Sequence, residues 1–64
     1  MGNIIFKASV SWMGKGVYCE GGTRNFSVGI DEPLELGGEN KAMNPVEMLL
    51  CSLGGGLCVC AASL

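Results

Sequence analysis

The sequence predicts an α+β fold in which a three-stranded antiparallel meander is followed by one long buried helix. Two observations lead to this fold class. The first half of the 64-residue chain alternates between apolar and polar residues in short stretches, which is typical of strands. The second half holds an uncharged apolar run that opens with a strong helix-start signal. Strands followed by a helix indicate one α+β domain over residues 1–64, with the helix packed on the sheet.

The meander is expected over residues 3–30, with strands at residues 3–12, 17–20 and 25–30. The first and third strands have apolar side chains at every second position, so one face of each is expected to be buried. Turns are expected at Gly14-Lys15-Gly16 and at Gly21-Gly22, because glycine adopts the backbone angles that tight turns require.

Residues 31–43 are expected to form a polar loop between the sheet and the helix. The loop contains Pro33 and Gly37-Gly38, which interrupt regular structure. It also holds four of the six acidic residues of the chain, namely Asp31, Glu32, Glu35 and Glu39. Such a composition favours a solvated loop.

The helix is expected over residues 44–64. Asn44 suits the N-cap, since its side-chain oxygen accepts from a free backbone N–H one turn on. Pro45 suits the first helical position, and Glu47 stands where a capping-box side chain reaches back to the cap. These independent signals agree on where the helix begins.

The helix is apolar all round, because no charged residue follows Glu47. A helix of this kind is buried in protein or in lipid. Gly54, Gly55 and Gly56 together place the isolated helix at a disadvantage of about 2–3 kcal/mol, which close packing against another backbone offsets. A chain of 64 residues with 48% hydrophobic residues is too short to enclose such a helix. We therefore expect a homodimer through the central helix.

Charge and composition exclude several classes of function. The net charge is −2 and the four basic residues are scattered, which argues against a nucleic-acid partner. The N-terminus lacks the basic start and apolar run of a signal peptide, so the four cysteines are expected to stay reduced in the cytoplasm. A tail-anchored membrane helix is a further alternative, but the glycines and the lack of flanking basic or aromatic residues disfavour it.

The cysteines do not form a convincing metal site, and no cofactor is expected. Cys51 and Cys58 share one helix face, whereas Cys58 and Cys60 point to different sides. Four thiolate ligands would also require Cys19 from the sheet, and the chain contains no histidine. Taken singly, each cysteine is most simply a small apolar residue. The alternative is thiol redox chemistry, which requires a cation beside the thiolate.

Two basic residues of the expected sheet, Lys15 and Arg24, are available as that cation. The run IDEPLELGGENKAMNPVEMLLCSLGGGLCVCAAS, from Ile30 to Ser63, then adds a resemblance. Its LGG segment, NPVE helix start and glycine-rich apolar helix, in that order, resemble the N-terminal half of the OsmC/Ohr family of thiol-dependent peroxidases. The resemblance implies an intertwined homodimer that reduces organic hydroperoxides with electrons from a thiol reductant. It also implies a reactive helix cysteine, a resolving cysteine in the C-terminal half and an arginine that activates the thiolate.

This chain departs from the family pattern at the reactive position. Gly56 stands where the family has its reactive cysteine, so Cys60, one turn further on, and Cys58 are the candidate thiols that remain. Lys15 matches the activating arginine, and keeps its charge but not its planar fork. Glu47 matches a supporting glutamate of the family, although its capping role alone explains it.

Two functions from different classes are therefore expected. The first is an OsmC/Ohr-like protein whose peroxidase activity is degenerate, with Cys60 or Cys58 as the remaining thiol. The second is a non-catalytic, dimerising OsmC-like module whose activity is self-association.

Overall fold

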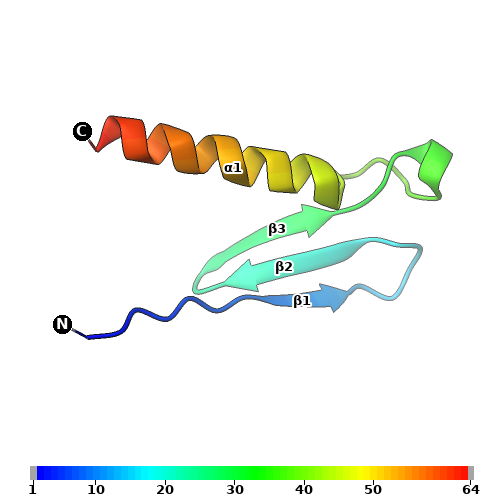
Figure 1. Ribbon diagram of the computed structural model, residues 1–64. Helices are drawn as coiled ribbons and strands as arrows, with labels where there is room; N and C mark the ends of the chain where they lie inside the picture. The colour runs from blue at the N-terminus through cyan, green and yellow to red at the C-terminus, as the bar shows by residue number, and fades with distance from the viewer. Residues whose placement is uncertain (1, 64) are drawn as a thin grey trace.

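The computed structural model describes residues 2–63 and confirms the α+β fold class (Figure 1). The elements in chain order are β1 (Ser9–Trp12), β2 (Cys19–Thr23), β3 (Phe26–Ile30), the 3₁₀ helix η1 (Leu34–Leu36) and α1 (Pro45–Ala62). The strands form one antiparallel sheet in the order β1-β2-β3. The sheet is therefore the expected meander, and one helix follows it.

The predicted turn at Gly21-Gly22 is wrong, because both glycines lie inside β2. Gly21 pairs with Val10 on one side and with Val28 on the other. The chain turns instead at Arg24 and Asn25, between the paired residues Thr23 and Phe26. Arg24 has φ of +53°, so a non-glycine residue adopts the left-handed backbone that a two-residue hairpin turn needs.

β1 is shorter than the expected strand over residues 3–12. Its first paired residue, Ser9, lies opposite Gly22, one residue before the end of β2. Residues 2–8 extend past the hairpin, and within the described part of the chain no strand pairs with them. The hydroxyl of Thr23 donates to the carbonyl of Lys7, which is a side-chain continuation of the ladder.

The loop over residues 31–43 is organised around Asp31 rather than solvated throughout. Asp31 is 2% exposed, and both of its carboxylate oxygens accept backbone N–H groups. Oδ1 accepts from Glu32 at 2.8 Å, and Oδ2 accepts from Lys41 at 3.1 Å and from Glu39 at 3.4 Å. The N–H of Asp31 donates to the carbonyl of Met43, which joins the two ends of the loop.

The stability of this loop is expected to depend on pH through Asp31. Burial favours the neutral acid, but the three backbone donors and the charge of Lys41 outweigh it and hold the pKa of Asp31 below its usual 3.8. A lowered folded-state pKa stabilises the fold fully above 3.8, and the stabilisation is lost as pH falls through the folded-state pKa. We expect urea midpoints to fall in this acid range for the natural chain and to change less for Asp31→Asn. The surface variant Glu35→Gln is the control and should follow the natural chain.

The LGG segment has a structural reason for each glycine. Gly37 closes η1 with φ of +89° and donates its N–H to Leu34. Gly38 lies against the backbone of Glu32, where a Cβ would come within 2.5 Å of the carbonyl carbon and 2.7 Å of the nitrogen. The loop therefore closes on itself only if residue 38 lacks a side chain.

The helix begins as the sequence predicts. Asn44 Oδ1 accepts from the N–H of Glu47 at 2.8 Å, and Glu47 Oε1 accepts from the N–H of Asn44 at 2.9 Å. Both halves of the capping box are thus present, and Pro45 occupies the first helical position. The helix ends at Ala62, and the expected last residue, Leu64, lies outside the described residues.

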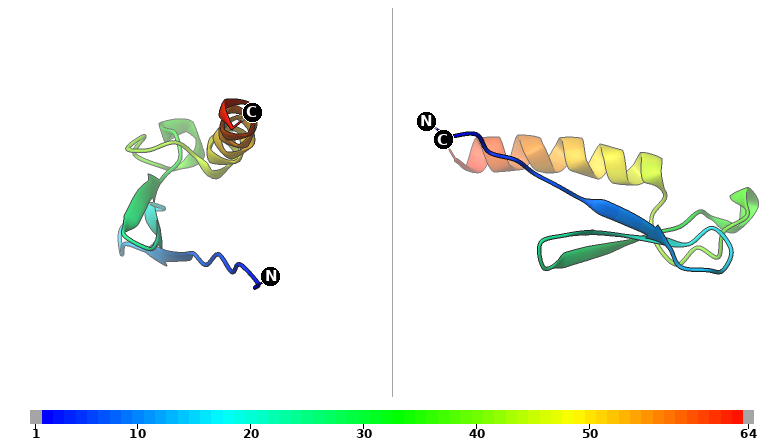
Figure 2. Two further views of the ribbon diagram at one scale, coloured as in Figure 1. Left: turned by 90° about the vertical axis from the view of Figure 1, so that its left-hand side faces the viewer. Right: turned by 90° about the horizontal axis from the view of Figure 1, so that it is seen from below.

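One chain by itself encloses no hydrophobic core among residues 2–63, and no residue of α1 is buried. The helix runs beside the sheet but stands off from it, as Figures 1 and 2 show. The radius of gyration is 14.6 Å, whereas a compact domain of this length has roughly 11 Å. The expected burial of the helix is therefore not provided by its own sheet.

Candidate functional site

The three cysteines of the helix are free thiols on an exposed surface. Cys51, Cys58 and Cys60 are exposed, and Cys19, in β2, is half-buried. The Cys19 thiol lies 3.5 Å from the carbonyl of Val17, to which it donates. Among residues 2–63 of one chain, the candidate thiols Cys58 and Cys60 are exposed and so are not enclosed in the apolar pocket that an oxidant would occupy.

Lys15 lies in the β1–β2 loop, between two glycines with positive φ, Gly14 at +89° and Gly16 at +59°. This loop is braced by Trp12, whose indole N–H donates to the carbonyl of Gly16 at 3.0 Å. The loop stands at the opposite end of the molecule from the C-terminal turns of α1 (Figures 1 and 2). One chain does not bring Lys15 to Cys60.

Arg24 is the cation that the fold places at the same end as the C-terminal half of α1, since the β2–β3 hairpin points that way (Figure 1). Its guanidinium carbon lies 4.9 Å from the centre of the Phe26 ring, which is a cation–π contact. A sequence signal for this placement was the Arg24-Asn25 pair, since asparagine is common in hairpin turns.

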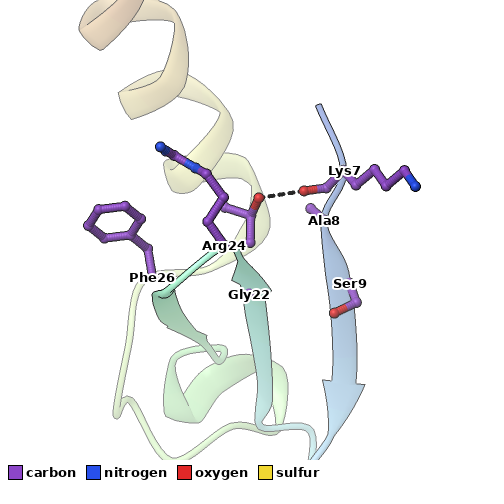
Figure 3. A pocket seen from close by; sticks show the side chains of 7 residues that line it. Lys7, Ala8, Ser9, Gly22, Arg24 and Phe26 are labelled. Atoms are coloured by element: carbon purple, nitrogen blue, oxygen red, sulfur yellow. Dashed lines mark hydrogen bonds between the residues drawn. The ribbon is translucent and has the colours of Figure 1, made fainter. Parts of the chain in front are cut away.

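A shallow hollow of about 500 Å³ lies beside this hairpin (Figure 3). Its lining residues are Lys7, Ala8, Ser9, Gly22, Thr23, Arg24 and Phe26. The side chains of Lys7 and Arg24 point to opposite sides of it in Figure 3. The two cations do not converge, so the hollow offers no focused site for an anion.

Glu47 and Gly56 of α1 stand in different surroundings. The carboxylate of Glu47 is engaged in the capping box, so its structural role accounts for it. A Cβ at Gly56 would meet nothing within 4 Å, so the single chain leaves room for a side chain at the family's reactive position.

Composition raises two further possibilities, a metal site and a membrane-spanning helix. Among residues 2–63, no group of three or more cysteine or acidic side chains stands close enough to hold a metal ion. Helix α1 is long and apolar enough to span a membrane, with 18 residues of mean hydropathy 1.6. A buried core helix of a soluble protein meets the same length and composition criteria, whereas no residue of α1 is buried within one chain, so these criteria alone do not assign the helix to a membrane or to a protein core.

The arrangement thus consists of exposed helix thiols, an apolar helix that the sheet does not cover, and two candidate cations, Lys15 and Arg24, at opposite ends of the sheet. Comparisons of this chain with protein-family models, with curated proteins and with solved structures found no match.

Proposed function

We propose that this chain is an OsmC/Ohr-like protein that acts in the cytoplasm as a homodimer paired through α1 and has lost efficient hydroperoxide reduction. The LGG, NPVE and glycine-rich helix segments support the family. The observation that carries the dimer is that no hydrophobic side chain is buried among residues 2–63. The large apolar side chains of α1 that stay exposed are Val46, Leu49, Leu50, Leu53, Leu57 and Val59.

The exposed area supports a partner of the size of a second copy. The chain exposes 5525 Å², whereas a folded monomer of this mass exposes about 3,900 Å². The excess is about 1,600 Å² per chain, so two chains would together bury about 3,200 Å², which is typical of obligate homodimers. Burial of this kind is the main favourable contribution to folding and association.

The same geometry argues against efficient peroxidase turnover. Glycine at position 56 supplies no nucleophile. Cys60 is displaced from it by four residues, about 6 Å along the axis, and a misplacement of about 1 Å can cost on the order of a hundredfold in rate. In one chain Lys15 lies at the far end from Cys60 (Figure 1), so a pair of Cys60 with Lys15 requires a second copy.

Thiol oxidation tests the degenerate activity. We expect the natural chain to show negligible turnover of an organic hydroperoxide with a dithiol reductant, and at most slow, stoichiometric oxidation of Cys60. Gly56→Cys should raise the rate of thiol loss, because a side chain fits there and a thiol regains the family position. The measurement is peroxide consumption together with thiol titration, and Gly56→Ser is the matched control.

Turnover by the natural chain at ordinary enzymatic rates, abolished by Cys60→Ser, would show that the activity is intact. An unchanged rate for Gly56→Cys would show that a thiol at this position does not restore the site.

The second candidate function is a non-catalytic module that only self-associates. It is favoured by the exposure of every helical thiol and by the capping role of Glu47. The two candidates differ in one outcome: if Gly56→Cys dimerises normally but gains no reactivity towards hydroperoxide, the module is the better description.

A further inference from the structure

Helix α1 has two faces of different character. At 100° per residue, the large apolar residues gather on one side. We call this side the leucine face, and it consists of Val46, Leu49, Leu50, Leu53 and Leu57, each between 60% and 74% exposed. The opposite side carries small residues, namely Cys51, Gly54, Gly55, Cys58 and Ala62. The larger apolar area to be covered lies on the leucine face.

The leucine face points away from the sheet of its own chain. Met48 is half-buried and lines an apolar hollow of about 270 Å³ together with sheet residues such as Val10, Val28 and Ile30. Leu53 follows Met48 by five residues, which turns it about 140° round the helix axis. The side of α1 that lies towards the sheet is therefore not the side that carries the leucines, and no described residue covers them.

We propose that the leucine face pairs with the leucine face of a second copy, antiparallel, with the two-fold axis at Leu53. This assignment rests on the proposed homodimer and specifies its surface and register. A two-fold interface brings the same patch of both subunits together, so it must be complementary to itself. Leu49 and Leu57 each lie four residues from Leu53, so Leu49 packs against Leu57 of the partner subunit, and Leu57 against Leu49.

Charge and area fit this occupant. The leucine face carries no charged side chain, so it offers nothing to recognise a charged partner. The excess exposed area argued above belongs to the whole chain; it is large enough for an obligate homodimer, and the leucine face supplies one part of it. Antiparallel helices also place the positive end of one helix dipole beside the negative end of the other.

The two-fold axis at Leu53 gives a direct test by disulfide formation. Packed helix axes are 8–10 Å apart and Cα atoms lie about 2.3 Å from each axis, so facing Cα atoms at the two-fold axis are about 3.4–5.4 Å apart. This range overlaps the 4.4–6.8 Å between the Cα atoms of a disulfide, so the cysteine of Leu53→Cys should form a disulfide with the same position of the partner subunit. Leu50→Cys is the matched control on the same face, because its two copies would lie about 9 Å apart along the axis.

The experiment uses the full chain with Cys19, Cys51, Cys58 and Cys60 changed to alanine, and each new cysteine is oxidised with diamide. Diamide takes up the two electrons and two protons that the thiols lose. We expect Leu53→Cys to shift to twice the chain mass on a non-reducing gel and Leu50→Cys to stay at the monomer mass. If the alanine background does not fold, Leu53→Cys is made in the natural chain and its disulfides are mapped by peptide mass.

Different outcomes overturn different claims. A dimer by sedimentation in which Leu53→Cys does not cross-link would overturn the register but leave the proposed homodimer. A link from Cys51 to Cys58 of the partner subunit in the natural chain would place the interface on the small-residue side instead. A monomer, or a chain found in the membrane fraction, would overturn the homodimer itself.

Discussion

Gly38→Ala is expected to lower the free energy of unfolding by about 2–4 kcal/mol, because it forces the loop over residues 31–43 open. An alanine Cβ at this position would overlap the backbone of Glu32, 2.5 Å from its carbonyl carbon and 2.7 Å from its nitrogen. Backbone atoms cannot rotate aside as a flexible side chain does. The loop would have to move, and the hydrogen bond from the Gly38 N–H to the Pro33 carbonyl would be lost with it.

The matched control for this prediction is Gly21→Ala in β2. A Cβ there would lie 3.5 Å from Val28 Cγ1 and 3.7 Å from Ile30 Cδ1, which is ordinary contact. Its free energy of unfolding should rise by roughly 0.4–1 kcal/mol, because alanine restricts the unfolded chain. Urea midpoints compared at one protein concentration measure both variants. Equal midpoints for Gly38→Ala and the natural chain would mean that the loop does not close against Glu32.

The parts of the fold that the sequence predicted well depend on neighbours along the chain. The start of α1 is one case, because Asn44, Pro45 and Glu47 form a cap within one turn, and the capping box was found as expected. The order of three strands and a helix is another, since apolar periodicity reports it directly.

The parts that could not be predicted depend on residues far apart in the sequence. The sequence predicts a turn at Gly21, yet this residue lies in the middle strand. Val10 of β1 and Val28 of β3 pair with it from either side. The sequence predicts that Asp31 is a solvated acid, yet the structure buries it. Its carboxylate tolerates burial because backbone N–H groups donate hydrogen bonds to both oxygens. Any non-proline residue supplies a backbone donor, so the pattern of side chains does not predict which residues will donate to Asp31.

The candidate site shows the same division. The exposed helix thiols and the capping role of Glu47 follow from helical spacing and local signals. The separation of Lys15 from Cys60, and the placement of Arg24 nearer the C-terminal half of the helix, depend on which hairpin points to which end of the sheet (Figure 1). Spacing along the chain does not contain that information.

Leu53→Asp is expected to dissociate or unfold the protein, whereas Ser52→Asp should leave it nearly unchanged. In the single chain Leu53 is 60% exposed, so an aspartate there would stand in water and cost little if the protein were a monomer. In a dimer with its two-fold axis at Leu53, two unpaired carboxylates would be buried against each other, which costs several kcal/mol. Ser52 is also exposed and lies about 100° round the helix from Leu53, so the same charge at the next position is a close control.

Sedimentation equilibrium and circular dichroism, measured at the same micromolar concentration, distinguish the two cases. We expect twice the chain mass for the natural protein and for Ser52→Asp, and a monomer or an unfolded chain for Leu53→Asp. A Leu53→Asp protein that still sediments as a folded dimer would show that the leucine face is not the interface. A natural chain that is folded and monomeric would show that α1 keeps its apolar side chains in water without a second copy. This is the least expected result, because leaving the five large aliphatic side chains of the leucine face exposed is costly.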